Sequence, residues 1–380
     1  MNIGILDASE ICYASLKFFL DSIEQALRVK GITTYRITDF NYEVLQQKYD
    51  AIVGLNSSFC AATLADGSYL MDYFQCPFFN ILLDPPYYHH GALNKHMENM
   101  HVICLDRGHV EYCKRYYPPC KSVEQGYLLG PLDKVIPYEE KEIDLLFMGS
   151  CADEAEILQQ AKAFYNMDWA DYIIENLIAN SLKNPNIPME QQMKIVLEQG
   201  KINVSESDFV TLMSTLGQYA EFYLRGYYRK KIIQALVDAG VQVHVAGTGW
   251  EELAKTMPNN LILEGVVDFA KSAQLIAKSK ICLNVMPWFK DGIHDRVLTA
   301  MHNGTICLSD SSLLCTELFR NGENIMFYSL EHLDELPGIV KAILDDERKA
   351  KEIVTKGMQC GETYNWNSFV QKYILQHLYE

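Results

Sequence analysis

Positive charge is scarce in this sequence. Its 380 residues include 33 Lys and Arg against 49 Asp and Glu, which gives a net charge of −16. A protein that binds nucleic acid needs a basic face to displace the counterions of the phosphates, and the longest basic run here is Arg229-Lys230-Lys231. We therefore expect no nucleic acid among its partners, whereas a local basic pocket for a single diphosphate is compatible with this composition.

Long apolar runs and paired cysteines are missing as well. No run approaches the roughly 20 apolar residues of a membrane-spanning helix. The first residues, MNIGILDASEICY, lack the basic stretch that opens a signal peptide. The 11 cysteines form no CxxC pair and lie mostly in apolar runs, where a free thiol packs as a small core residue. These absences predict a cytoplasmic protein with reduced cysteines and no transmembrane segment.

Four nucleotide-binding and catalytic motifs are absent. No glycine follows the first predicted strand, NIGIL at residues 2–6, and Gly247-Thr248-Gly249 lacks the third glycine of a dinucleotide fingerprint. No GxxxxGK[ST], GxSxG or HExxH occurs either. The sequence therefore argues against NAD, FAD, a P-loop, a serine-hydrolase elbow and a zinc-protease site, and we expect neither a cofactor nor a metal.

Short apolar runs alternate regularly with amphipathic stretches. The composition, 49% hydrophobic and 22% charged, is that of a globular protein. In the first part of the chain, apolar spacing predicts a helix at 15–30 that ends at Gly31. Continuous apolar runs predict strands at 2–6, 33–37, 51–55, 78–83 and 102–105. Strands and helices that alternate in this way form parallel sheets covered on both faces.

A second series of the same kind follows a segment at 131–142 that is rich in Pro and charge. Its predicted strands are 143–148, 241–246, 261–263, 281–285, 305–308 and 325–328, and its predicted helices are 219–239, 269–278, 296–302, 336–358 and 367–378. The stretch 152–217 has helical spacing without a strand signal and interrupts this series as a helical insertion. We therefore predict two doubly wound α/β domains facing a cleft, 1–135 and 143–358, and a C-terminal helix, 359–380, that packs back on the first.

The second series resembles the donor domain of GT-B glycosyltransferases, most closely the CgeB-like (spore-coat protein) group with its "glycosyl transferases group 1" region. The similarity lies in the order and spacing of YLRGYYRKKIIQAL (223–236), VQVHVAGTGW (241–250), LEGVVDF (263–269), KICLNVMP (280–287), DGIHDRVLTAMHNGTICLSD (291–310) and ELFRNGENIMFY (317–328). Two segments of the first series, FNILLDPPYYHH (79–90) and VICLDRGHVEYCKRYYP (102–118), resemble the acceptor half of the same group.

This resemblance implies a nucleotide-sugar donor, UDP-linked by preference, in the second domain. An arginine can pair with a diphosphate oxygen in a charge-assisted hydrogen bond. Arg225 and Arg229 lie one helical turn apart and either reach the diphosphate or form a solvated, ion-paired face. Trp250 and Trp288 follow strands and either stack on the ligand or fill the core. The implied donor-binding set is Ser150, Arg225, Arg229, Gly247, Thr248, Gly249, Trp250, Asn284, His294, Asp295, Arg296 and Thr299.

One position departs from the family pattern. Retaining members place two acids eight positions apart; the first contacts the sugar and the second holds the ribose hydroxyls. Asp291 suits the first role, but Thr299 stands at the second and cannot accept two hydroxyls as a carboxylate does. A neighbouring acid, Asp295 or Asp310, is a candidate substitute. The chain also has no DxD triplet, the metal–diphosphate signature of the other large glycosyltransferase fold.

In the first domain, the segment 84–90 (DPPYYHH) directly follows the predicted strand 78–83. Family analogy puts a polar side chain near the reacting sugar at about this place. A histidine can move a proton near neutral pH, so His89 or His90 is favoured, with Asp84 as the residue that orients it. The alternative is a proline-stiffened surface loop, and His109 is a second candidate. The implied catalytic set is His89, His90, Asp84 and Asp291.

The leading hypothesis is a metal-independent, retaining glycosyltransferase. It would move a sugar from a UDP-sugar or another NDP-sugar to an acceptor that is a protein, a glycan or a small molecule. Two alternatives stay open. One is a catalytically degenerate GT-B chain that binds sugar nucleotides or serves as a spore or surface assembly factor, and Thr299 motivates it. The other is a sugar-nucleotide epimerase, which needs no acceptor.

Overall fold

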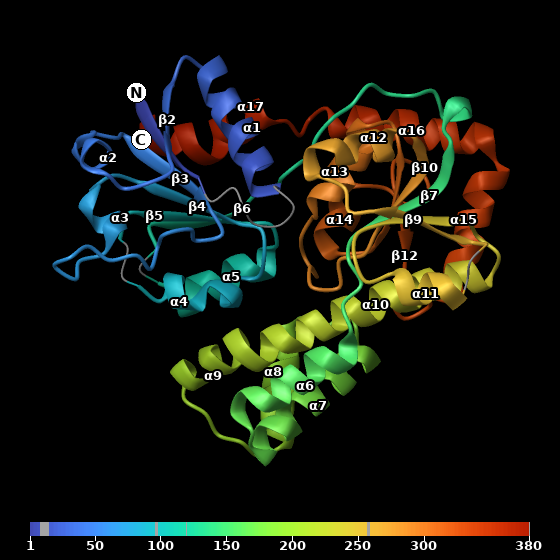
Figure 1. The fold of residues 1–380 in the computed structure, drawn as a ribbon, viewed down its shortest axis with the longest axis horizontal. Helices are drawn as coiled ribbons and strands as arrows, with labels where there is room; N and C mark the ends of the chain where they lie inside the picture. The colour runs from blue at the N-terminus through green and yellow to red at the C-terminus, as the bar shows by residue number, and fades with distance from the viewer. Residues whose placement is uncertain (8–14, 96–97, 119, 257–258, 380) are drawn as a thin grey trace. The chain divides into compact units, whose positions relative to one another are not determined.

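The chain forms two compact units, each with its own sheet (Figure 1). The structure is a computed structural model that describes residues 1–7, 15–95, 98–118, 120–256 and 259–379. The N-terminal unit contains Met1–Gly130 together with Thr363–Glu380, and the C-terminal unit contains Pro131–Glu362. Each sheet has six parallel strands with helices between them, which confirms the predicted α/β class.

The sheet of the N-terminal unit has the order β2-β1-β3-β4-β5-β6. Its strands are β1 (Asn2–Leu6), β2 (Thr33–Ile37), β3 (Ala51–Leu55), β4 (Phe78–Leu82), β5 (Met100–Cys104) and β6 (Ser122–Gln125). The central strands β3, β4 and β5 are buried along their whole length, as expected for apolar strands covered on both faces. The edge strand β2 alternates exposed and partly covered residues instead.

Helices connect these strands: α1 (Ser15–Val29), α2 (Tyr42–Gln46), α3 (Leu70–Tyr73), α4 (His90–Leu93), α5 (Arg107–Tyr116) and a 3-10 helix (Pro86–His89). As predicted, α1 buries apolar residues at helical spacing and is followed by Gly31 with a φ of 77°. The C-terminal residues of this unit form α17 (Trp366–Val370), a π-helical turn (Gln371–Leu375) and α18 (Gln376–Tyr379). Figure 1 shows α17 packed beside α1.

The sheet of the C-terminal unit has the order β12-β11-β10-β7-β8-β9. Its strands are β7 (Ile143–Met148), β8 (Val243–Ala246), β9 (Leu261–Gly265), β10 (Ser279–Asn284), β11 (Ile306–Asp310) and β12 (Met326–Tyr328). Read from β9 to β12, this is the 3-2-1-4-5-6 order of the Rossmann fold. The chain adds β8 and β9 on one side of β7, then returns to place β10 on the other side.

The helical insertion lies between β7 and β8. It consists of α6 (Glu154–Tyr165), α7 (Asp168–Lys183), α8 (Met189–Gln199), α9 (Glu206–Leu212) and a π-helical turn (Met213–Gly217), and it runs into α10 (Gln218–Asp238). This confirms the predicted helical stretch. Figure 1 shows α10 passing from the insertion to the sheet, and α10 packs against both α6 and α7. One helix therefore belongs to both parts.

The C-terminal unit contains further helices outside the insertion. They are α11 (Glu251–Thr256), α12 (Ser272–Ala277), α13 (Asp295–His302), α14 (Leu313–Leu318), α15 (Leu336–Asp345), α16 (Glu347–Gly361) and two 3-10 helices (Tyr138–Glu140 and Phe269–Lys271).

Two differences from the predicted elements have a clear physical reason. The single helix predicted at 336–358 is two helices, α15 and α16, because Asp346 leaves the helical conformation (φ −115°, ψ 80°) and caps α16 by accepting a hydrogen bond from Lys349 N. Strand β6 was not predicted, because its four residues, SVEQ, are largely polar and only half-buried at the sheet edge. A sequence pattern based on burial has little signal at such an edge.

Candidate functional site

The order of the second sheet places its switch point between β7 and β10. In open α/β sheets, ligands bind outside the carboxyl ends of the strands at the point where the strand order reverses. Ser150 follows β7, and Asn284 is the last residue of β10. Both were predicted donor-binding residues, and the parallel pairing of β7 with β10 brings them to the same edge of the sheet.

Three predicted arginines gather at this edge. Arg229 Nη1 donates a hydrogen bond of 2.9 Å to the main-chain oxygen of Ser150, and Arg296 Nη1 donates one of 2.8 Å to Asn284 Oδ1. The Cζ atoms of Arg229 and Arg296 lie 5.9 and 6.0 Å from the ring centroid of Phe147, a buried residue of β7. Arg225, one turn before Arg229 on α10, stacks on Trp288 with its Cζ 3.7 Å from the ring centroid. The structure therefore collects positive charge in a chain of strongly negative net charge.

Asn284 is held by two residues that the sequence did not single out. Its Nδ2 donates to Ser309 Oγ at 2.9 Å, and the Tyr328 hydroxyl donates to its main-chain oxygen at 2.9 Å. All three residues are buried. The amide is thereby fixed with Oδ1 toward Arg296. Ser309 and Tyr328 lie at or next to the ends of the neighbouring strands β11 and β12. This position at a strand end is the one signal in the sequence that could have identified them.

The glycine turn after β8 packs against the loop after β7. A Cβ on Gly249, whose φ is 82°, would lie 2.0 Å from Cys151 O, and one on Gly247 would lie 2.6 Å from Gly149 O. Thr248 completes the contact by donating from its main-chain N to Ser150 Oγ at 3.2 Å. Glycine at these two positions therefore allows two loops of the protein to approach each other. This explains the need for glycine there by packing within the protein, which the family resemblance did not imply.

Trp250 is an anchor of the same loop contact. Its side chain is 1% exposed, its Nε1 donates to Gly149 O at 2.8 Å, and its ring meets Phe147 edge to face. Of the two roles expected for it, the structure supports the core anchor and not stacking on a base, because no face of the indole reaches the surface.

Thr299 does not present a polar group at the site. It is 2% exposed, and its hydroxyl donates to Asp295 O one turn earlier in α13. The predicted role in donor binding has no support in this geometry. Asp291 is half-buried in the loop between β10 and α13.

Two carboxyl groups with shifted pKa values lie near this loop. Burial would raise the pKa of Asp295, but His294, whose Nδ1 lies 2.8 Å from Asp295 Oδ1, and Arg296 outweigh it, so the pKa of Asp295 is lowered. Burial lowers the pKa of His294. Asp310 is buried at the end of β11 and accepts a hydrogen bond from Met286 N; burial raises its pKa to about 6.

The N-terminal unit places its predicted catalytic residues just after β4. Asn56 donates from Nδ2 to Asp84 Oδ2 at 3.3 Å and accepts from Leu83 N at 2.8 Å. Asn56 follows β3 with a φ of 48°, a conformation that Asn tolerates. Asn56 was not among the predicted site residues. Burial lowers the pKa of His89, and the Asp84 carboxylate opposes that shift.

The other two predicted histidines have separate surroundings. His90 Nδ1 lies 3.1 Å from the Tyr117 hydroxyl, and burial, with a smaller effect of Lys95, lowers the pKa of His90. His109 is buried in the first turn of α5 beside Tyr87. Asp106 caps this helix by accepting from Gly108 N and His109 N. Of His89 and His90, His89 is the one whose pKa the Asp84 carboxylate affects.

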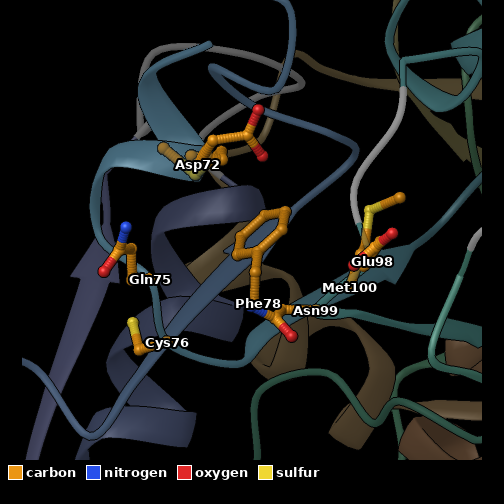
Figure 2. Close-up of a pocket in the computed structure, with 8 residues that line it drawn as sticks. Asp72, Gln75, Cys76, Phe78, Glu98, Asn99 and Met100 are labelled. Atoms are coloured by element: carbon orange, nitrogen blue, oxygen red, sulfur yellow. The ribbon is translucent and has the colours of Figure 1, made fainter. Parts of the chain in front are cut away.

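A hollow with a volume of about 270 Å³ lies at the amino ends of strands in the first sheet. Figure 2 shows the residues that line it. It is lined by Met71, Asp72, Gln75, Cys76, Phe78, Glu98, Asn99 and Met100. Phe78 and Met100 begin β4 and β5, so the hollow lies at the amino ends of these strands, whereas Asp84 follows a carboxyl end. None of the predicted site residues lines this hollow.

The residues that the structure describes contain neither a metal-ligand cluster nor a membrane-spanning helix. In those ranges, no cluster of three or more His, Cys, Asp and Glu side chains is arranged to hold a metal ion. No helix in the same ranges combines the length and apolar character that crossing a membrane requires.

Solved structures that resemble this chain identify its class of fold. Sucrose-phosphate synthase (tll1590) from Thermosynechococcus elongatus aligns with a TM-score of 0.56 and 11% identity over 100% of this chain and 98% of its own. Anabaena Alr3699/HepE, in complex with UDP and glucose, aligns with a TM-score of 0.57 and 12% identity over 100% and 99%. An alpha-glucosyltransferase, in complex with UDP and a 13-mer DNA, gives 0.57 and 9% over 100% of both chains. The chain has the two-domain GT-B fold.

The family comparison agrees with the fold over part of the chain. Residues 229–374 match the model of the family described as "Glycosyl transferase-like". The chain therefore carries a glycosyl transferase-like region, which begins at Arg229 and spans the strands β8 to β12. No curated protein matches the sequence.

Proposed function

We propose that this protein is a glycosyltransferase that takes a sugar from a nucleoside diphosphate sugar, with UDP as the preferred nucleotide. The observation that carries the proposal is the group of three arginines, Arg225, Arg229 and Arg296, at the β7–β10 switch point. Guanidinium groups match phosphate oxygens in geometry and charge. The glycosyl transferase-like family match and two similar structures solved with UDP support the same donor class.

The proposed chemistry relies on charge stabilisation. When the bond between sugar and diphosphate breaks, negative charge grows on the leaving oxygens, and fixed guanidinium groups stabilise it without reorganisation. In the retaining course that we propose, the leaving diphosphate oxygen helps to take the acceptor proton, so no side-chain nucleophile is required. The arginines would supply the positive charge that a metal supplies in other transferases, which makes the proposed reaction metal-independent.

Asp84 and His89 are the proposed acceptor-side groups. Burial keeps His89 neutral near pH 7 because it lowers the pKa of this residue, and a neutral imidazole can accept a proton or donate a hydrogen bond to a sugar hydroxyl. Asp291 is the proposed contact to the transferred sugar. We further propose that the chain belongs to the CgeB-like subgroup and acts in the cytoplasm.

The test is a titration with UDP-, GDP-, ADP-, dTDP- and CMP-sugars, with NAD as a control. We expect one nucleotide class to bind, and we expect Arg296→Ala to weaken that binding about 10- to 100-fold, since a hydrogen bond to a charged group contributes about 1.5–3 kcal/mol. Arg348→Ala is the matched control, because Arg348 is exposed on α16 and outside the site. Its affinity should equal that of the wild type.

Each outcome separates the hypotheses. Binding of no nucleotide sugar, or equal binding by Arg296→Ala and the wild type, would contradict the proposal. Binding with neither transfer nor hydrolysis of the donor would favour the non-catalytic binder. Conversion of the donor sugar without an acceptor would favour an epimerase.

A further inference from the structure

The loop after β10 carries a tryptophan that is buried although it lies outside the sheet. Trp288 is 8% exposed, and its ring centroid lies 5.6 Å from that of Phe289 and 5.9 Å from that of His294. A small cavity of about 20 Å³ is lined by Trp288 together with Ser181 of α7 and Met189 of α8. Trp288 therefore sits where the loop of the proposed donor site meets the helical insertion, and both parts restrict its movement.

Arg225 stacks on this ring. Its Cζ lies 3.7 Å from the Trp288 ring centroid, whereas the Cζ of Arg229 is 5.9 Å from the same centroid. A separation of 3.7 Å is that of two planar groups in van der Waals contact. Among aromatic side chains, indole attracts a cation most strongly, and the attraction grows when the pair is removed from water. The contact of Trp288 with Arg225 therefore has the geometry of a strong cation–π pair.

This kind of contact suits an arginine that has to bind an anion. Stacking uses the face of the guanidinium and none of its five N–H donors, which lie in the plane of the group. Arg229 and Arg296 are held by hydrogen bonds to protein oxygen atoms, as described above. A long side chain that is held in its binding position before the ligand arrives loses less conformational entropy on binding.

We infer that Trp288 is a positioning residue that holds Arg225 in place for the diphosphate of the donor. This inference rests on the proposed function and adds to it a role for the helical insertion, which packs around α10 and lines the cavity beside Trp288. Trp288 acts through Arg225 and need not touch the nucleotide.

A double-mutant cycle on UDP affinity tests the inference. Trp288→Leu removes the ring, and Arg225→Lys keeps the charge but removes the planar group that stacks. We expect each single variant to weaken UDP binding by about 5- to 20-fold, the size of a partly desolvated cation–π contact. The double variant should be no weaker than the weaker single variant, since either change alone breaks the pair. Trp288→Phe keeps an aromatic ring and should restore part of the affinity.

Trp250 provides the matched control. It is another buried tryptophan of the same unit, but its contacts are Phe147 and Gly149. The effects of Trp250→Phe and Arg225→Lys on UDP affinity should therefore add. Additive effects of Trp288→Leu and Arg225→Lys, in a wild type that binds UDP, would overturn the inference and leave the proposed function standing. A wild-type protein that binds no nucleoside diphosphate would overturn both.

Discussion

At the scale of single residues, arginines have different surroundings in the two units, and their roles differ accordingly. The arginines at the β7–β10 edge are held by an amide, a carbonyl and a ring, whereas Arg36 in the N-terminal unit is surrounded by the carboxylates of Asp7, Asp21 and Glu24. Acidic partners of that kind neutralise a guanidinium and anchor structure. The hydrogen bonds of Arg229 to Ser150 O and of Arg296 to Asn284 Oδ1 go to oxygens without formal charge, so these contacts do not neutralise the guanidinium groups.

Glycines of similar conformation also differ in what surrounds them. We predict that Gly249→Ala lowers the free energy of unfolding by more than about 3 kcal/mol, because the new Cβ would lie 2.0 Å from Cys151 O in addition to the cost of a positive φ. Gly265→Ala is the control: its φ is 73°, but nothing lies within 4 Å of the added Cβ, so about 1 kcal/mol is expected. Urea unfolding followed by circular dichroism measures both. Equal losses would mean that the clash is relieved by movement of the loop.

At the scale of elements, the C-terminal helices complete the core of the N-terminal unit. Phe369 and Ile374 are fully buried, and Trp366 packs against Phe19 of α1. At the other end of this segment, His377 Nε2 lies 2.6 Å from Glu124 Oε1 of β6, and its ring lies 4.9 Å from that of His101 of β5. Two histidines therefore lie together where α18 meets the sheet.

We predict that acid destabilises this part of the protein. Burial, together with His377 and Lys121, lowers the pKa of His101 to about 4, whereas an unfolded histidine has a pKa near 6.5. The unfolded chain thus binds a proton that the folded chain excludes, so stability is complete above about pH 6.5 and is lost progressively as the pH falls toward 4. His101→Gln cannot take up this proton. Its free energy of unfolding, measured against pH, should fall less than that of the wild type over this window.

Thermal unfolding provides a second check on that prediction. Thermal unfolding of His101→Gln and wild type should differ in pH slope between 4 and 6.5 and run parallel above pH 7. Parallel profiles over the whole range would show that His101 does not contribute to the acid sensitivity.

At the scale of the whole molecule, the two units are not equivalent as stretches of chain. The C-terminal unit is one continuous segment, Pro131–Glu362, and it contains the three arginines with their supporting residues. The N-terminal unit needs two separate segments, since residues after Thr363 supply part of its core.

We predict that residues 131–362 fold when expressed alone and bind UDP within about threefold of the full-length affinity, because a domain with its own core can fold independently. Residues 1–130 alone should aggregate, since the surface that covers Phe369 and Ile374 would be exposed. Circular dichroism and a UDP titration measure the first, and size-exclusion chromatography the second. A fragment 131–362 that folds but does not bind UDP would mean that the nucleotide needs residues outside it.

The sequence alone determined the class of fold and the main candidates. Continuous apolar runs in β3, β4, β5 and β10 report burial on both faces, and helical spacing marks α1 and α10, because these periodicities are properties of the chain itself. Arg225, Arg229, Arg296 and Asn284 were identified through the family resemblance, which implied a nucleotide-sugar donor in the second domain.

Only the tertiary structure decided how these residues are used. Trp250, for which the sequence left ligand stacking and core packing open, and Thr299 of the implied donor-binding set are both buried. The supporting residues Ser309 and Tyr328 come from strands that become neighbours only in the sheet. The stacking of Trp288 on Arg225 joins two residues 63 positions apart. Contacts between distant segments depend on strand order and helix packing, which local periodicity does not encode.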